Sequence, residues 1–169
     1  MMKKALVFRP ERCLMCLSCV LACQLKALGI EDPRDQPLRT GPKPPRRLSM
    51  VLAAGTPWPE RCRHCTQAPC AEACISGSIV LDDASGAVRH RPETCVGCGT
   101  CRLVCPFNGI APDDSGDCMT KCSLCPEDAV PRCVEACGTG ALTLSDGDRH
   151  AQEKRRTYAR EMIGDRRDG

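Results

Sequence analysis

Residues 95–106 read CVGCGTCRLVCP, a run of four cysteines spaced C-x2-C-x2-C-x3-C with a proline directly after the last cysteine. Residues 13–23 repeat this spacing, and residues 62–74 and 122–137 carry looser versions whose middle gaps are four and seven residues long. We number these cysteine groups one to four in chain order. Together they contain every cysteine of the chain except Cys118.

The rest of the composition is too poor in large apolar side chains for an ordinary enzyme with a hydrophobic core. The 169 residues include 17 cysteines but only 2 Phe, 1 Tyr and 1 Trp. Without the cysteines the apolar share falls well below the usual value, so something other than apolar burial must hold the fold together. Abundant cysteine means disulfides in a secreted chain and metal in an intracellular one.

The N-terminal sequence favours the intracellular alternative. Lys3 and Lys4 are followed by only a short apolar stretch before Arg9 and Pro10, which does not fit a signal peptide. The longest uncharged stretch, residues 48–59, is interrupted by Pro57 and is much shorter than the roughly 20 residues of a membrane helix. We therefore expect a soluble, cytoplasmic protein with reduced thiols and no direct membrane span.

The spacing favours iron–sulfur clusters over the other uses of cysteine. In the bacterial run C-x2-C-x2-C-x3-C-P, three thiolates hold one [4Fe–4S] cluster and the fourth reaches a second cluster. We expect the fourth cysteine to start a short helix that turns it away from the loop. Structural zinc usually separates two C-x2-C pairs by a longer stretch, a disulfide scaffold conflicts with the odd number of cysteines, and a thioredoxin-like dithiol needs only one C-x-x-C. Since such runs work in pairs, four groups predict four clusters.

An internal repeat supports two modules of an α+β fold. Residues 9–13 (RPERC) reappear as residues 91–95 (RPETC). We expect two bacterial dicluster-ferredoxin-like modules with short helices, β-hairpins and long loops. Groups two and three form the inner module, residues 59–114, and groups one and four form the outer module, residues 1–30 and 115–145.

A hairpin is expected within the inner module, and the other segments are expected to lie outside the two modules. Residues 78–81 and 87–89 flank a Gly-containing turn and predict a hairpin. Residues 31–58 predict a Pro-rich covering loop in which residues 48–52 could be an edge strand. Residues 146–169 form a basic tail, in which residues 151–163 could be a solvated helix or a helix that docks on a partner.

Four short segments resemble a known family over about residues 5–145. They are residues 61–65 (RCRHC), 105–107 (CPF), 121–125 (KCSLC) and 131–137 (PRCVEAC). These segments are similar to the four-cluster [4Fe–4S] ferredoxin-type electron-transfer subunits of the dimethylsulfoxide-reductase iron–sulfur family, and most of all to the iron–sulfur proteins associated with carbon monoxide dehydrogenase.

The resemblance implies that the fourth cysteine of each group ligates the cluster of the paired group. The implied iron-ligand sets are Cys13, Cys16, Cys19 with Cys137; Cys122, Cys125, Cys133 with Cys23; Cys62, Cys65, Cys70 with Cys105; and Cys95, Cys98, Cys101 with Cys74. Cys118 is left over. It is either a spare thiol or a ligand that displaces Cys122 through a shift of the loop.

The resemblance also implies a function in electron transfer, in anaerobic metabolism. We see no nucleophile–base pair and no phosphate loop, so we expect no catalytic residues. The implied partners are a large catalytic subunit of carbon monoxide dehydrogenase, hydrogenase, formate dehydrogenase or aldehyde oxidoreductase type, and a second acceptor such as a flavin-containing NAD(P) oxidoreductase or a ferredoxin. Positive charge near a ligand raises the reduction potential, and five cations lie within a few residues of the expected ligands: Arg61, Arg63, Arg102, Lys121 and Arg132.

The alternative is an iron–sulfur protein whose clusters serve structure or redox sensing, for example in binding nucleic acid. Binding of single-stranded nucleic acid commonly uses aromatic side chains, on which bases stack, interleaved with basic ones. The chain has only 4 aromatic side chains (2 Phe, 1 Tyr and 1 Trp). We therefore expect no nucleic-acid partner.

Overall fold

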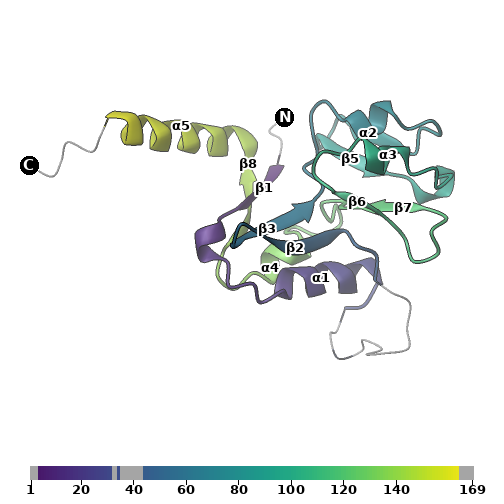
Figure 1. The fold of residues 1–169 in the computed structure, drawn as a ribbon, viewed down its shortest axis with the longest axis horizontal. Helices are drawn as coiled ribbons and strands as arrows, with labels where there is room; N and C mark the ends of the chain where they lie inside the picture. The colour runs from purple at the N-terminus through teal and green to yellow at the C-terminus, as the bar shows by residue number, and fades with distance from the viewer. Residues whose placement is uncertain (1–3, 32–33, 35–43, 164–169) are drawn as a thin grey trace, which may run out of the picture.

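The computed structural model describes residues 4–31, 34 and 44–163, in which all strands pair in antiparallel twos (Figure 1). The strands are β1 (Lys4–Phe8), β2 (Leu48–Ala53), β3 (Thr56–Arg61), β4 (Ile79–Asp82), β5 (Ala87–His90), β6 (Ile110–Pro112), β7 (Met119–Lys121) and β8 (Leu142–Asp146). The helices are α1 (Ser18–Ala27), α2 (Pro69–Glu72), α3 (Thr100–Leu103), α4 (Arg132–Glu135) and α5 (Gly147–Ile163), with the 3-10 turns η1 (Pro10–Arg12) and η3 (Pro92–Thr94).

The order of elements repeats once along the chain. Each half begins with a strand, a 3-10 turn, a cysteine group and a helix, and continues with a hairpin, a second cysteine group, a one-turn helix and a final strand. The final strand of each half pairs with the first strand of the other half, so that β1 pairs with β8 and β4 with β5. This exchange brings groups one and four together and groups two and three together.

Figure 1 shows the same pairing among the helices, because α1 and α4 lie together at one end of the body and α2 and α3 at the other. Two small apolar clusters fill these ends. One contains Ile79, Val88 and Ile110, and the other contains Leu6 and Leu142. Cysteines form part of both clusters, as expected for a chain with few large apolar residues.

Several predicted elements are confirmed. Strands β4 and β5 form the expected hairpin, with Ile79 opposite His90. The two copies of the repeated sequence also share a structure that was not predicted, the 3-10 turns η1 and η3. The expected edge strand is β2, which pairs with β3. Residues 48–58 are therefore mostly a hairpin and not a loop, while residues 32–33 and 35–43 of the expected covering loop lie outside the described part of the chain.

The expectation that the fourth cysteine of each group starts a helix is wrong. Each of the four helices α1 to α4 instead carries the third cysteine of its group as its second residue. In groups two to four the fourth cysteine follows the end of that helix, and Cys23 lies within the longer α1. The C-x3-C step spans about one helical turn, so the turn runs between the two cysteines and not after them.

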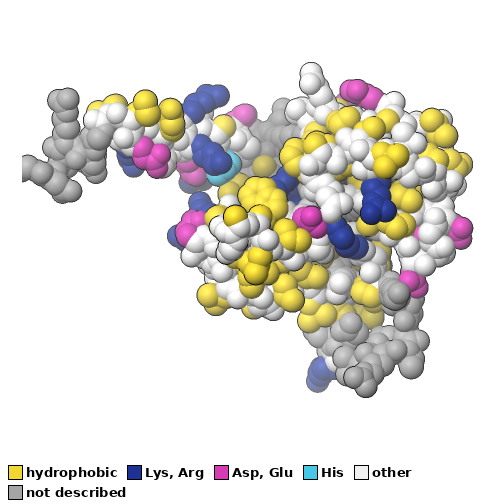
Figure 2. Space-filling model, viewed as in Figure 1, with side chains coloured by type: hydrophobic (Ala, Val, Ile, Leu, Met, Phe, Trp, Pro, Cys, Tyr) yellow, Lys and Arg dark blue, Asp and Glu magenta, His cyan; other side chains and the backbone are white. Residues whose placement is uncertain are grey.

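The predicted C-terminal helix is confirmed as α5, which projects from the body beyond β8 (Figure 1). No residue of α5 is buried, and Tyr158, Met162 and Ile163 are exposed together with many charged side chains (Figure 2). Among the described residues, no helix is both long enough and apolar enough to cross a lipid bilayer.

Candidate metal centres

The loops that carry the first cysteines of each group are tightly coiled. Met15 and Leu17 have φ values of 53° and 61°, and Gly97 and Gly99 occupy the matching places of group three with φ values of 64° and 75°. A positive φ costs a residue other than glycine about 1–3 kcal/mol and persists where the surrounding structure requires it, often at ligand sites.

Groups two and four are also matched in geometry. The backbone N–H of His64 donates to Cys62 Sγ at 3.4 Å, and the N–H of Leu124 donates to Cys122 Sγ at the same distance. Both donors lie at positive φ, 50° and 63°. Backbone N–H groups directed at sulfur stabilise thiolates and tune the potential of a cluster bound to them.

The cysteine side chains gather in four quartets, each of which joins three cysteines of one group with the fourth cysteine of another. Quartet A is Cys13, Cys16, Cys19 and Cys137; quartet B is Cys122, Cys125, Cys133 and Cys23; quartet C is Cys62, Cys65, Cys70 and Cys105; quartet D is Cys95, Cys98, Cys101 and Cys74. The structure therefore brings together the residues of each predicted ligand set, while their role as ligands stays a prediction.

Quartets A and B belong to the expected outer module, and the pKa values of their thiols reflect this arrangement. All four sulfurs of quartet A line one pocket, and burial followed by the charge of Cys137 raises the pKa of Cys19. In quartet B, burial is the main cause of the raised pKa of Cys23, and the thiolates of Cys122, Cys133 and Cys125 add to it.

Quartets C and D, which belong to the expected inner module, are arranged in the same way. Burial, followed by the charge of Cys62, raises the pKa of Cys70 to about 11, and Cys105 contributes in the same direction. The sulfurs of quartet D line a second pocket, and burial followed by the charge of Cys74 raises the pKa of Cys101. Thiolates that repel one another across a buried space are suited to share a cationic metal group.

Two of the fourth cysteines, Cys74 and Cys137, are held by hydrogen bonds. Burial opposes ionisation of Cys74, but hydrogen bonds from Ser78 (3.3 Å), the Ile79 N–H and Ser76 lower its pKa to about 7. Similarly, burial is outweighed at Cys137 by the Leu142 N–H at 3.3 Å and by the Thr139 hydroxyl, so the pKa of this thiol is lowered. These sulfurs are therefore prepared to bind metal as thiolates.

The quartets follow one another in the order A, B, C, D. Cys19 of quartet A contributes to the raised pKa of Cys133 in quartet B, and Cys62 of quartet C contributes to that of Cys122 in quartet B. Quartets C and D share one apolar cluster, which contains Cys70 and Cys101. Each quartet thus lies close to the next, and we call this arrangement the row of quartets.

Cys118 lies beside quartet D in this fold, and the alternative that it displaces Cys122 as a ligand stays a prediction. Cys118 lies in the β6–β7 hairpin against quartet D, where its Sγ, Cys95 Sγ and a ring nitrogen of His90 all lie within 4.8 Å of one another. Burial and the neighbouring thiolate of Cys95 raise the pKa of Cys118 to about 11. Cys122 itself belongs to quartet B. The spacing could not reveal this contact, because it depends on how the hairpin folds back.

Two buried cations between quartets B and C were recognised in the sequence as neighbours of ligands, but not as buried. Arg61 is 3% exposed and Lys121 is 4% exposed. The Arg61 Nε atom is buried without a hydrogen-bond partner among the described residues. An anionic group beside this atom would satisfy it, so both the donor set and its surroundings fit [4Fe–4S] clusters, which are anionic when held by four thiolates.

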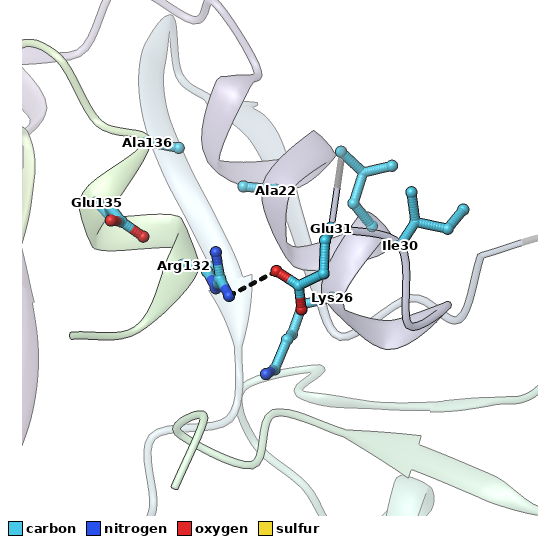
Figure 3. Close-up of a pocket in the computed structure, with 8 residues that line it drawn as sticks. Ala22, Lys26, Ile30, Glu31, Arg132, Glu135 and Ala136 are labelled. Carbon is cyan, nitrogen blue, oxygen red and sulfur yellow. Dashed lines mark hydrogen bonds and ion pairs between the residues drawn. The ribbon is translucent and has the colours of Figure 1, made fainter. Parts of the chain in front are cut away.

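The pocket drawn in Figure 3 lies between α1 and α4 and contains no cysteine. Arg132 donates to Glu31 at 2.9 Å and to Asp128 at 3.2 Å, and Lys26 donates to Asp128 at 3.3 Å. These ion pairs join the helices that carry Cys19, Cys23 and Cys133, so we interpret this pocket as a structural junction.

Comparison with known proteins agrees with this chemistry. The sequence profile of the family described as "4Fe-4S dicluster domain" matches residues 54–147. An iron–sulfur protein of Rhodospirillum rubrum is 34% identical, covering 90% of this chain and 87% of its own length. A ferredoxin of Methanocaldococcus jannaschii is also 34% identical and covers 86% of this chain and 75% of its own length.

A third relative is named as the polyferredoxin-like subunit of an aliphatic sulfonate oxidoreductase of Pyrococcus furiosus. It is 28% identical, covering 95% of this chain and 93% of its own length. The extent of these matches places the chain in the 4Fe-4S dicluster family of ferredoxin-type iron–sulfur proteins.

Proposed function

We propose that this chain is a non-catalytic electron-transfer subunit that binds four [4Fe–4S] clusters, one in each quartet, and relays single electrons between a catalytic oxidoreductase subunit and a second acceptor. The observation that carries the proposal is the grouping of sixteen cysteines into four quartets, each completed by a cysteine from another group. The name of the Pyrococcus furiosus relative, a polyferredoxin-like subunit of an oxidoreductase, supports it.

The donor set favours electron transfer over catalysis. A cluster held by four thiolates has no open iron position for a substrate, and it supplies a one-electron change of charge. The chain's own contribution is to fix the sulfurs and to direct N–H groups such as that of His64 at them.

The order of the quartets supports a relay. Quartets A and D lie at the two ends of the row, and each contains a cysteine that is exposed, Cys16 and Cys98. An electron received near one end would leave near the other, so one donor and one acceptor suffice. We propose that the two modules, residues 1–30 with 115–145 and residues 59–114, each hold two of the four clusters.

The partners are proposed by resemblance. The segments that are similar to proteins associated with carbon monoxide dehydrogenase favour a large catalytic subunit of that type, with hydrogenase, formate dehydrogenase and aldehyde oxidoreductase as related choices. A flavin-containing NAD(P) oxidoreductase or a ferredoxin would be the second partner. The exposed helix α5 is our candidate for the segment that docks on one of them.

The test is anaerobic purification of the full chain with the large subunit that co-purifies. We expect clusters that reduce reversibly in a redox titration and that are reduced rapidly when the catalytic subunit receives its substrate. Redox-silent clusters together with salt-dependent binding of nucleic acid would instead support the structural or sensing alternative.

A further inference from the structure

Arg61 and Lys121 occupy equivalent places in the two halves of the duplicated fold. Arg61 ends β3 directly before Cys62 of quartet C, and Lys121 ends β7 directly before Cys122 of quartet B. Strands β3 and β7 are the second strands of matching hairpins. The fold therefore places one buried cation next to each of the two quartets that meet in the middle of the row.

Each cation donates a hydrogen bond to a backbone carbonyl of a strand on the other side of this junction. Arg61 donates to the Cys62 carbonyl at 2.9 Å and to the carbonyl of Leu6 on β1, and β1 packs in the apolar cluster that contains Cys133 of quartet B. Lys121 donates to the Cys122 carbonyl at 2.9 Å and to the carbonyl of Val88 on β5 at 2.5 Å. The two side chains thus cross the junction in opposite directions.

Neither cation has an acidic partner within the described part of the chain. Among the described residues, no carboxylate lies within 4.0 Å of Arg61 or Lys121, although Lys26, Arg46, Arg89, Arg132 and Arg149 all form ion pairs. A buried charge without a counter-charge is strongly destabilising. The negative groups within reach are sulfurs.

The charges of sulfurs in quartets B and C and the charges of Arg61 and Lys121 shift one another's pKa values. Burial and the nearby Arg63 lower the pKa of Arg61 to about 10, and Cys122 and Cys133 of quartet B and Cys62 of quartet C oppose this effect. Lys121 acts on both quartets, because it lowers the pKa of Cys122 in quartet B and of Cys70 in quartet C against the larger effect of burial.

We propose that Arg61 and Lys121 are positioning residues whose buried charges compensate the clusters of quartets B and C, hold these two anionic sites side by side and raise their reduction potentials above the values they would otherwise have. This inference rests on the proposed four-cluster electron-transfer function. Reduction adds one electron to a site that is already anionic, so a nearby buried cation favours the reduced form. Water and salt screen such a cation much less than a surface charge.

The test uses the full chain, purified anaerobically and titrated with dithionite, which donates one electron to each cluster, while electron paramagnetic resonance follows the reduction steps. In Arg61→Gln and Lys121→Gln the charge is removed, while the amide can still donate to the carbonyls. Each variant should shift two of the four reduction steps to more negative potential and leave the other two unchanged.

Matched controls separate the charge from the packing. Arg102 follows Cys101 of quartet D as closely as Arg61 precedes Cys62, but its side chain is exposed, so Arg102→Gln should leave all four steps unchanged. Arg61→Lys and Lys121→Arg keep the charge and should restore the original potentials.

Each outcome of these titrations either supports or overturns the inference. Unshifted steps, or equal shifts of all four steps, in both glutamine variants would overturn the inference. If the glutamine variants lose clusters, retention of iron in Arg61→Lys and Lys121→Arg supports a need for charge, and equal loss in these variants overturns it. A wild-type chain with fewer than about sixteen iron atoms would contradict the proposed function itself.

Discussion

The thiol of Cys23 lies beside that of Cys122, although one belongs to the first cysteine group and the other to the fourth. Burial and then the charge of Cys122 raise the pKa of Cys23. The pairing of β1 with β8 explains this contact, because it joins the beginning and the end of the cysteine-bearing region. Metal sites shared in this way tie the integrity of one group to a distant residue.

Cys137→Ser should therefore remove or convert the cluster that depends on group one. The thiol of Cys137 lies with those of Cys13, Cys16 and Cys19 in quartet A. We expect the iron content to fall by between about one and about four atoms, as a cluster loses one iron or is lost entirely. Iron analysis and electron paramagnetic resonance of the purified variant measure this.

Cys118→Ser is the matched control, because Cys118 is a cysteine outside the quartets. Its iron content should equal that of the wild type, since Cys118 lies against Cys95 without completing a quartet. A loss of iron in Cys118→Ser as large as that in Cys137→Ser would show that the assignment of the quartets is wrong.

The cysteine spacing predicted that the groups work in pairs, because the fourth member of each group must serve a neighbour, and the family resemblance implied which sulfurs meet. The β4–β5 hairpin was also predictable, from two short segments that flank a Gly-containing turn, and so was most of helix α5, from the charged residues 151–163. The burial of Arg61 and Lys121 was not, since it depends on the packing of one half of the fold against the other.

Cluster insertion should become more favourable as the pH rises from about 7 to about 9. Burial raises the pKa of Cys70 to about 11 and that of Cys133 to about 12, so both are protonated in the metal-free protein at neutral pH. Iron binds the thiolate, and binding therefore releases protons. The measurement is reconstitution at several pH values. Visible absorbance follows cluster formation, and a pH-sensitive dye follows the released protons.

The metal-free fold should show the opposite pH dependence. A thiol whose pKa is raised on folding stabilises the fold below its unfolded pKa of 9.0, and this contribution disappears as the pH rises through about 11 to 12. Reconstitution that is independent of pH would contradict the protonation states described above.

Gly109→Ala should disturb quartet C. A Cβ atom at Gly109 would lie 2.6 Å from the Cys62 backbone nitrogen and 2.7 Å from the Arg61 carbonyl carbon. These are backbone atoms, so the cost should be about 1–3 kcal/mol of folding free energy or more, with weaker binding of the cluster held by Cys62. Thermal unfolding and iron content of the purified variant measure both effects.

Gly138→Ala provides the control for this variant. Gly138 also follows the fourth cysteine of a group, but a Cβ atom there meets nothing within 4 Å. Its stability and iron content should stay close to those of the wild type. Equal behaviour of the two alanine variants would contradict the close approach of Gly109 to the Arg61–Cys62 peptide.

Removal of residues 147–169 should leave the metal content unchanged. Helix α5 contributes no buried residue, so the quartets do not depend on it. If α5 docks on a partner, the truncated chain should instead lose its co-purifying large subunit, which gel filtration of the complex would reveal. Loss of iron on truncation would mean that α5 has a structural role in the cluster region.

The hairpin β6–β7 shows most clearly where the sequence was insufficient. β6 and β7 are three residues each, Ile110–Pro112 and Met119–Lys121, too short for a pattern of alternation to be recognised. Their importance emerges only in three dimensions, because β7 carries Lys121 into the junction and the hairpin brings Cys118 to Cys95. Local spacing thus indicated the candidate metal ligands, and tertiary pairing determined their surroundings.

The central claim is that all four quartets hold [4Fe–4S] clusters, and the most direct measurement is iron and acid-labile sulfide per chain in anaerobically purified protein, with native mass spectrometry of the intact complex. We predict about sixteen iron and about sixteen sulfide per chain. About eight iron atoms, or zinc in stoichiometric amount without sulfide, would contradict the account.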